Sequence, residues 1–195
     1  MSKCGKVTQA PIADIPMTPE TGEDCVEIKL LDAHTTWRSE EYLYDLMRER
    51  SEEADSHINI SHRTLPSWEE HLTFMARRPY YRWWLIFRGT DFAGSLSITN
   101  RNEIGIVLKQ AFRGMGIGRH ALQMLLDTAR PLPAVPSQRH GCFVANINPL
   151  NEASIHLFTR LGAVHIQNTY AFEERENAKK ESRPTDSTSA HHPAG

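Results

Sequence analysis

The sequence is poor in cysteine, in long apolar runs and in excess charge of either sign, and each absence removes a class of protein. Its three cysteines, Cys4, Cys25 and Cys142, are widely spaced and form no CxxC pair, so neither a disulfide framework nor a cysteine zinc site is expected. No apolar run approaches the roughly 20 residues that span a bilayer, and the N-terminal segment lacks the apolar stretch of a signal peptide. We therefore expect a cytoplasmic protein with reduced thiols and no membrane contact.

Charge and histidine content argue against two further classes. The 22 basic and 24 acidic residues give a formal net charge of −2, so electrostatic capture of nucleic acid is not expected. Ten histidines suggest metal binding, but the pattern HEXXH is absent, and the closest pairs, His57 with His62 and His191 with His192, lie in loop-like or tail sequence. We expect no metal site and no direct nucleic-acid binding.

What remains has the composition of one globular domain between two tails. Apolar residues make up 39% of the 195 residues, which is enough for a sizeable core. Residues 1–22 and 175–195 are rich in proline or polar residues and show no periodicity, so both are predicted to be disordered tails. The folded domain is predicted over residues 23–174.

Hydrophobic periodicity predicts a sheet with helices packed on it. Strands are predicted over residues 25–31, 80–88, 92–99, 103–108, 142–146, 163–166 and 168–174, and helices over 39–50, 67–78, 119–130 and 150–161. Ser67 and Glu70 form a capping box at the start of the second helix, and Gly162 suits the position after the last one. The order predicts an α/β (α+β) fold with a mixed, mostly antiparallel sheet of six to seven strands and about four helices.

The stretch RGMGIG (113–118) joins a predicted strand to a predicted helix. A dinucleotide fingerprint needs its third glycine one residue later, where Arg119 stands, and a βαβ unit in place of antiparallel strands. The P-loop pattern GxxxxGK[ST] is absent. The glycines therefore favour a backbone cradle at a helix N-terminus that holds a pyrophosphate, with Arg113 and Arg119 as flanking cations.

This glycine turn, after the strand EIGIVL (103–108), resembles the acetyl-CoA loop of the GNAT N-acetyltransferase superfamily. The stretch ANINPLNEASIHLFTRLGAV (145–164) resembles the strand and helix that follow in that family, and the first 100 residues match it mainly in element order. The resemblance implies the GNAT fold and acetyl-CoA as co-substrate. It also implies a cofactor site at Ile106, Val107, Leu108, Arg113, Gly114, Met115, Gly116, Ile117, Gly118, Arg119, Asn146, Asn151 and Phe158.

Within this site several details stay open. Gly105 in the middle of a strand suggests a bulge or a close approach of another group. Asn146 and Asn151 fit contacts to the cofactor arm and equally fit turn and helix capping. In the family a backbone N–H near Val107 or Leu108 polarises the thioester carbonyl.

Proton transfer is less well defined by the resemblance. Many members carry a tyrosine seven residues after the helix asparagine, but this sequence has Phe158 there, which excludes a phenol acid at that position. Ser154 and His156 on the same helix and Tyr170 further along are the remaining candidates, or the thiolate leaves through water. Glu103 stands where members often hold the carboxylate that deprotonates the amine, although a solvated strand end explains it equally well.

The acceptor pocket is expected to form from the first helix pair and its loop, at Trp37, Arg38, Tyr42 and His62. The favoured function is N-acetylation of a small amine such as an aminosugar, a sugar nucleotide or a modified nucleoside. The alternatives are acetylation of a protein N-terminus or lysine, and a non-catalytic acyl-CoA-binding module, which Phe158 supports. The sequence leaves the acceptor and homodimerisation open.

Overall fold

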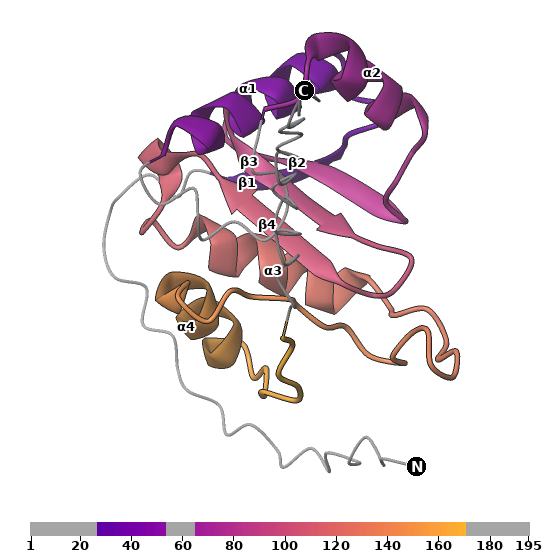
Figure 1. Cartoon of the computed structure of the whole chain (residues 1–195). Helices are drawn as coiled ribbons and strands as arrows, with labels where there is room; N and C mark the ends of the chain where they lie inside the picture. The colour runs from indigo at the N-terminus through magenta and orange to yellow at the C-terminus, as the bar shows by residue number, and fades with distance from the viewer. Residues whose placement is uncertain (1–26, 54–64, 171–195) are drawn as a thin grey trace, which may run out of the picture. The chain divides into compact units, whose positions relative to one another are not determined.

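The sheet has four strands, in a computed structural model that describes residues 27–53 and 65–170. The strands are β1 (Ile28–Asp32), β2 (Arg82–Arg88), β3 (Asp91–Ile98) and β4 (Ile104–Leu108). Their spatial order follows the sequence, and every neighbouring pair is antiparallel (Figure 1). The chain divides into two units, Met1–Ala163 and Val164–Gly195, and all four strands belong to the first.

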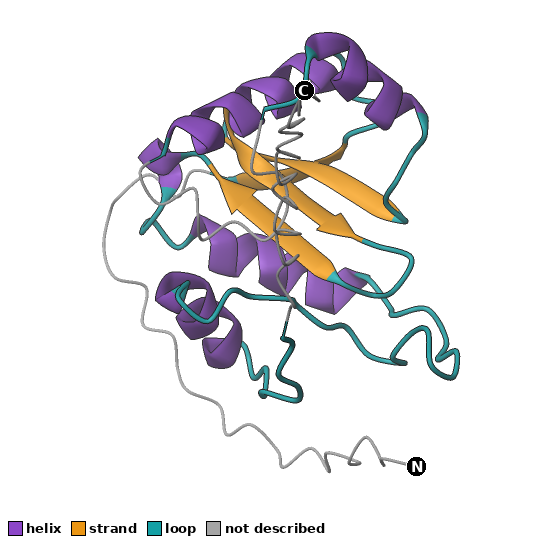
Figure 2. Cartoon of the chain, viewed as in Figure 1, coloured by secondary structure: helices purple, strands orange, loops and turns teal. Residues whose placement is uncertain are grey.

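Helices cover both faces of this sheet (Figure 2). The described residues contain four α-helices and one 3-10 helix: α1 (Ser39–Glu52), α2 (Trp68–Ala76), η2 (Gln110–Phe112), α3 (Ile117–Thr128) and α4 (Glu152–Arg160). The α-helices α1 and α2 pack on one face, and α3 and α4 pack on the other. The predicted number of helices is confirmed for this part of the chain.

The alternation of side chains along β2 explains why the domain has two apolar layers. Successive residues of a strand point to opposite faces, so Trp83, Leu85 and Phe87 join the cluster beneath α1 and α2. Trp84 and Ile86 point the other way and join the cluster with α3. The sheet is thus buried on both faces and holds the two helix pairs apart.

The predicted helix ends agree with the structure. The capping box is present: Glu70 N–H donates to Ser67 Oγ at 3.2 Å, and Ser67 N–H donates to Glu70 Oε2 at 2.8 Å. Gly162, with φ of 89°, follows the C-cap Leu161 of α4, in the left-handed conformation that favours glycine.

Three predicted strands are wrong within the described residues. Residues 142–146 make only an isolated parallel bridge, Glu103 with Val144, in which Ile104 N–H donates to Val144 O at 2.7 Å. Residues 163–170 contain no strand, and 171–174 lie outside the described residues. Alternation of apolar and polar residues shows which side chains a strand could bury, but a strand forms only where a neighbouring strand supplies backbone hydrogen bonds. The sheet observed here is consequently four-stranded and entirely antiparallel.

Of the two alternatives for Gly105, the bulge is excluded, because β3 and β4 pair in unbroken register from Gly94–Leu108 to Ile98–Ile104. A Cβ at Gly105 would lie 3.0 Å from Ser97 Oγ, so close approach explains this glycine. The register shift lies instead between β2 and β3, next to Gly94. A Cβ at Gly94 would lie 2.1 Å from Val107 O, a contact that the paired strands could not absorb.

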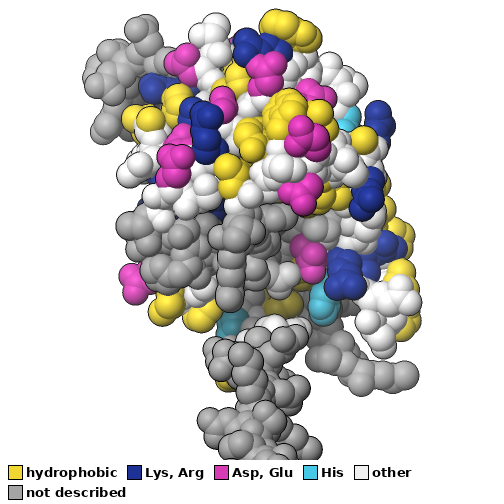
Figure 3. Space-filling view, turned by 45° about the horizontal axis from the view of Figure 1, so that its top comes forward, with side chains coloured by type: hydrophobic (Ala, Val, Ile, Leu, Met, Phe, Trp, Pro, Cys, Tyr) yellow, Lys and Arg dark blue, Asp and Glu magenta, His cyan; other side chains and the backbone are white. Residues whose placement is uncertain are grey.

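The predicted tails, residues 1–22 and 175–195, lie outside the described residues. Among the helices that the structure does describe, none combines the length and the apolar character of a membrane span. On the face shown in Figure 3, lysine and arginine side chains alternate with aspartate and glutamate, and the coloured atoms show no broad field of one sign.

Candidate functional site

The glycine turn adopts a conformation that depends on its glycines. Gly114 and Gly116 both have φ of +76°, in the left-handed region that costs an L-residue about 1–2 kcal/mol. A Cβ at either position would meet no protein atom within 4 Å. Backbone conformation therefore accounts for these two glycines, and the space in front of them is open.

The turn presents unpaired backbone donors at the start of α3. Gly116 is the N-cap and makes no side-chain capping bond. Among the residues that the structure describes, none accepts a hydrogen bond from the N–H groups of residues 116–119, and the next N–H, that of His120, donates to Gly116 O at 3.0 Å. Four unpaired donors at the positive end of a helix dipole are suited to hold an anion.

Arg113 braces this turn instead of standing beside it as a mobile cation. Its Nε and Nη2 donate to Leu108 O, both at 3.0 Å, and its guanidinium also binds the Glu53 carboxylate at 2.5 and 3.1 Å. Glu49, one turn earlier in α1, accepts from Gln110 N–H at 2.6 Å. The C-terminal end of α1 thus fixes the chain between β4 and α3, whereas Arg119 is exposed and pairs with no described residue.

The outer edge of β4 offers a second set of backbone groups. Ile104 N–H points to this edge, because it donates to Val144 O, and Lys109 N–H points inward to Ala93 O. Antiparallel alternation then turns the N–H groups of Ile106 and Leu108 outward and that of Val107 toward β3. Neither outward N–H has an acceptor within residues 27–53 and 65–170. An extended ligand can form hydrogen bonds with these backbone groups, as an additional strand would.

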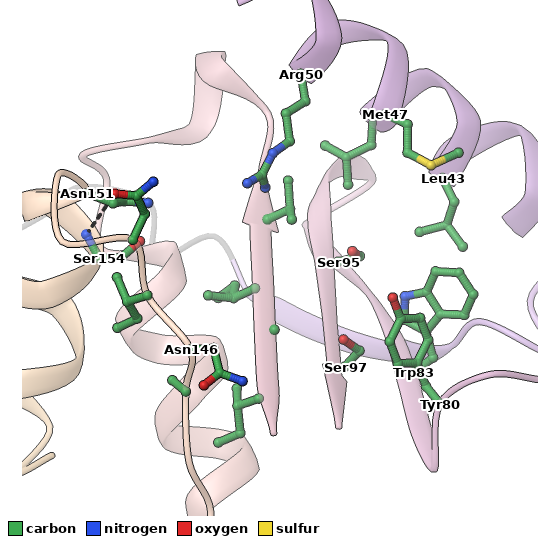
Figure 4. Close-up of a pocket in the computed structure, with 18 of the residues that line it drawn as sticks. Leu43, Met47, Arg50, Tyr80, Trp83, Ser95, Ser97, Asn146, Asn151 and Ser154 are labelled. Atoms are coloured by element: carbon green, nitrogen blue, oxygen red, sulfur yellow. Dashed lines mark hydrogen bonds between the residues drawn. The ribbon is translucent and has the colours of Figure 1, made fainter. Parts of the chain in front are cut away.

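A cavity of about 270 Å³ lies beside that edge (Figure 4). Its floor consists of residues of β3 and β4 that face α1, with the small side chains Ser95, Ser97 and Gly105 leaving the room. Its roof is one stripe of α1 at helical spacing: Leu43, Leu46, Met47 and Arg50. Its aromatic wall is formed by Phe74, Tyr80 and Trp83.

The opposite wall comes from residues 145–158, which lead into α4 and include most of it. Asn146, Asn151, Ser154 and Phe158 line the cavity here, and Figure 4 shows the first three on the side opposite Trp83 and Tyr80. Asn151 Oδ1 accepts from Ser154 N–H at 3.0 Å, so it caps α4 as well as lining the cavity.

Glu103 lies next to this wall but is not among the residues that line the cavity. It is half-buried, and both carboxylate oxygens are engaged: Oε2 accepts from Thr99 Oγ1 at 3.0 Å and Oε1 from Asn146 Nδ2 at 3.2 Å. The carboxylate therefore ties β4 to the segment that carries Asn146. A proton from the cavity would have to reach it through water.

The described members of the sequence-predicted acceptor set, Trp37, Arg38 and Tyr42, do not line this cavity. Trp37 is 82% exposed, with the Arg38 guanidinium over its ring at 5.3 Å. Tyr42 packs its ring against Phe87 and Phe92. His62 lies outside the described residues. Tyr170 belongs to the second unit and is 84% exposed.

Sequence reasoning missed the residues of α1 that do line the cavity. Of this helix only Tyr42 is predicted to contact the acceptor, whereas the cavity is lined by an apolar stripe that continues to Arg50, a charged residue at the same helical spacing as Leu43 and Met47. A cation within an apolar stripe was the available signal. Ser95 and Ser97 gave another, since they place hydroxyls on the face of β3 that carries no other polar side chain.

Burial changes the acid–base behaviour of three cavity residues. Burial lowers the pKa of Arg50. The negative charge of Glu53 raises this pKa, and the positive charge of Arg113 lowers it further, but burial is the largest effect. Burial raises the pKa of Tyr80, which stays a neutral phenol. Burial also lowers the pKa of His71, whose Nε2 pairs with Glu40 O at 2.8 Å while its Nδ1 has no partner. Arg50 is thus the charged side chain of the described cavity lining.

No group of three or more His, Cys, Asp or Glu side chains within the described ranges is arranged to hold a metal ion. The described lining of the cavity offers backbone donors, hydroxyls, amides, one imidazole and one guanidinium. Such groups orient reactants and stabilise developing charge.

Comparison with known proteins identifies the fold and the family. Residues 21–164 match the family model described as the acetyltransferase (GNAT) domain. Among curated proteins, no sequence matches the chain significantly.

Several solved structures are similar in fold. RimL, a ribosomal L7/L12 alpha-N-protein acetyltransferase in complex with coenzyme A, is 22% identical, with 68% of this chain and 77% of that chain covered and a TM-score of 0.52. A domain from Methanocaldococcus jannaschii DSM 2661 is 25% identical (70% and 87% covered, TM-score 0.52). MccE, the microcin C7 self-immunity acetyltransferase in complex with acetyl-CoA and AMP, is 20% identical (76% and 85% covered, TM-score 0.50).

Proposed function

The chain belongs to the acetyltransferase (GNAT) domain family as an acetyl-CoA-dependent N-acetyltransferase, and we propose that its acceptor is the primary amine of a small molecule. Aminosugars, sugar nucleotides and modified nucleosides are the classes that we favour. The observation that carries this choice is the cavity beneath α1, which is enclosed by helix, sheet and the 145–158 segment and borders β4 at Gly105. Its volume of about 270 Å³ suits part of a small molecule better than a folded protein surface.

The donor occupies the two sets of unpaired backbone groups. The N–H groups of residues 116–119 hold the pyrophosphate, and the outer edge of β4 at Ile106 and Leu108 pairs with the pantetheine arm. Gly114 and Met115 complete the turn, and Arg119 adds a mobile positive charge at its rim. Asn146, Asn151 and Phe158 lie across the cavity from β4, where they contact the arm from the other side.

The chemistry is direct attack of a neutral amine on the thioester carbonyl. A bond forms between the amine nitrogen and the acetyl carbon, the carbon–sulfur bond breaks, and the electron pair leaves on the thiolate. The outward N–H of Ile106 or Leu108 stabilises the oxyanion, because that of Val107 is directed toward β3. The amine loses its proton to Glu103 through water, and the thiolate is protonated by Ser154 or by water.

Thiol release from acetyl-CoA with a panel of amines tests the proposal. The panel contains aminosugars, amino sugar nucleotides, aminonucleosides and short peptides with a free N-terminus, and the control omits the amine. We expect release above the control with at least one small amine and its product heavier by one acetyl group. Tight acetyl-CoA binding without turnover of any amine would instead support a non-catalytic acyl-CoA-binding module, which is the reading that Phe158 favours.

Acetylation of a protein amine is the second candidate. RimL, one of the similar structures, acts on a ribosomal protein N-terminus according to its description. If this chain acts likewise, peptides ending in a free amine are acetylated more efficiently than every small amine of the panel.

A further inference from the structure

Three cavity residues, Trp83, Ser97 and Gly105, form one row across the sheet. Trp83 in β2 pairs with Ser97 in β3, and Ser97 pairs with Gly105 in β4. Directly paired residues point to the same face of a sheet, and all three line the cavity. Neighbouring strands lie about 4.8 Å apart, so the row covers roughly 10 Å from the backbone of Trp83 to β4. It thus leads from the aromatic wall of the cavity to the strand that borders the donor.

Trp83 places a hydrogen-bond donor without a partner at one end of this row. The residue is only 7% exposed, and no described residue accepts from its Nε1–H. The ring of His34 lies edge-on to the indole, with centroids 6.1 Å apart, but forms no hydrogen bond with it. Figure 4 shows the indole nitrogen on the side of the ring that faces Ser95 and Ser97. Because a buried N–H without an acceptor is unfavourable, a ligand oxygen that accepts from it gains binding energy.

Ser97 adds a hydroxyl in the middle of the row. It is 9% exposed, and within the described part of the chain its Oγ has no hydrogen-bond partner. This oxygen lies over Gly105, 3.0 Å from the position that a Cβ there would occupy. A serine hydroxyl both donates and accepts, whereas an indole N–H only donates. Hydroxyl groups of a ligand match both partners, since they accept from an N–H and exchange hydrogen bonds with another hydroxyl.

The aromatic wall beside these groups suits a compact ring. The rings of Tyr80 and Trp83 meet edge-on, with centroids 4.7 Å apart and an interplanar angle of 68°. Figure 4 shows the Tyr80 hydroxyl turned to the same side as the indole nitrogen, where it offers a further neutral donor. Aromatic side chains contribute large apolar surfaces, against which the C–H groups of a saturated ring can pack. The wall therefore combines apolar contact with hydroxyl recognition.

We propose that the acceptor is an aminosugar whose ring lies along this row, with one hydroxyl accepting from Trp83 Nε1–H, another bound to Ser97 Oγ, and the amine directed to β4. The proposal rests on the acetyltransferase function proposed above and selects one of its three acceptor classes. Gly105 has no side chain, so the path from Ser97 to the thioester position stays open. The two hydrogen bonds fix how the ring lies in the cavity and thereby hold the amine toward the acetyl carbon.

Deoxy derivatives of an aminosugar test this inference. First, kcat/KM is measured for glucosamine, galactosamine and mannosamine, and then for the 3-deoxy, 4-deoxy and 6-deoxy derivatives of the best of them. For the wild type we expect at least two derivatives to be about tenfold or more less efficient than the parent, because the lost oxygen leaves a buried group unpaired. In Trp83→Phe, which keeps an aromatic ring and lacks the N–H, the ratio for one of these derivatives should fall to about one. In Ser97→Ala the ratio for the other should fall likewise.

Trp84→Phe is the matched control. Trp84 is the next residue of β2, but it packs on the opposite face of the sheet with the cluster beneath α3. The same truncation there should leave every ratio as in the wild type. If Trp83→Phe and Ser97→Ala lower kcat/KM for parent and derivatives alike and keep their ratios, both residues serve only the structure and the inference is wrong.

The inference and the proposed function fail in different ways. Equal kcat/KM for the parent aminosugar and all its deoxy derivatives in the wild type overturns the inference, and so does acetylation of other small amines with no aminosugar acetylated. In both cases the small-molecule acetyltransferase function stands. Preference for peptides over every small amine, or acetyl-CoA binding without turnover of any amine, would contradict the proposed function and the inference together.

Discussion

His71 joins two helices through a single ring nitrogen. The side chain is 1% exposed, and its Nε2–H donates to Glu40 O in α1 at 2.8 Å. The rings of Tyr44 and Trp68 lie against it, with centroids at 5.4 and 5.6 Å. Because a carbonyl can only accept, Nε2 carries a proton. Burial lowers the pKa of the ring, so it is neutral at neutral pH and its unpaired Nδ1 is bare. This contact positions α2 beside the α1 stripe that roofs the cavity.

The buried imidazole predicts a loss of stability in mild acid. Burial lowers the pKa of His71 in the folded state, so the unfolded chain binds the proton first as the pH falls. The stabilisation is complete above the unfolded pKa, about 6.5, and is lost as the pH falls through the lower folded pKa. Urea unfolding at about pH 7.5 and about pH 5 should show a larger decrease for the wild type than for His71→Gln.

His156→Gln, which removes an exposed histidine of α4, is the matched control and should follow the wild type. An equal decrease in His71→Gln and the wild type would show that this imidazole does not set the acid limit.

At the scale of elements, Asn102 holds the connector between α3 and α4 in place. It is fully buried, with 0% exposure, and has φ of 64° in the turn before β4. Its Nδ2 donates to Leu132 O at 2.8 Å and to His140 O at 2.7 Å, and its Oδ1 accepts from Leu132 N–H at 2.8 Å. The connector that leads to Val144 and Asn146 is thereby fastened to the β3–β4 turn, which sets one wall of the cavity.

Replacing Asn102 should be costly. Asn102→Ala leaves two carbonyls and one N–H without partners and places alanine at a left-handed φ, so we expect a loss of about 3 kcal/mol or more in the free energy of unfolding. Asn102→Gly removes the backbone strain and should recover only about 1 kcal/mol of this loss.

The control is Asn100→Ala in the same turn, since Asn100 is exposed; the expected change is within about 0.5 kcal/mol. Denaturant unfolding measures all three variants. Wild-type stability in Asn102→Gly would mean that the three side-chain bonds do not hold the connector.

At the scale of the whole molecule, the features predicted correctly are those set by residues close in sequence, and the errors concern contacts between distant segments. The capping box and the glycine turn each depend on residues close in sequence, and the structure has both. The family assignment from the turn and the 145–164 stretch is confirmed by the family match over residues 21–164.

The errors concern residues whose role depends on distant partners. Residues 142–146 are predicted as a strand, yet they form only one isolated bridge, Glu103 with Val144, at the start of β4. Tyr42 and Arg50 lie on the same helix, and only their packing against the sheet decides that Arg50 faces the cavity while Tyr42 packs on Phe92. Neither Arg50 nor Asn102 belongs to a motif: Arg50 is marked only by its place in an apolar stripe, and the role of Asn102 depends on the distant connector that it binds.

The central claim is that acetyl-CoA binds to the backbone cradle before α3, and calorimetric titration of acetyl-CoA into Gly116→Glu tests it most directly. The new carboxylate would enter the open space before the unpaired N–H groups and repel the pyrophosphate. Gly162→Glu is the control, because Gly162 has a similar φ of +89° and equally open surroundings, so it carries the same strain away from the cradle.

We expect Gly116→Glu to weaken acetyl-CoA binding about 100-fold or more, roughly 2.8 kcal/mol. Gly162→Glu should bind like the wild type, and both variants should unfold with similar free energies. Wild-type affinity in a folded Gly116→Glu would contradict the account.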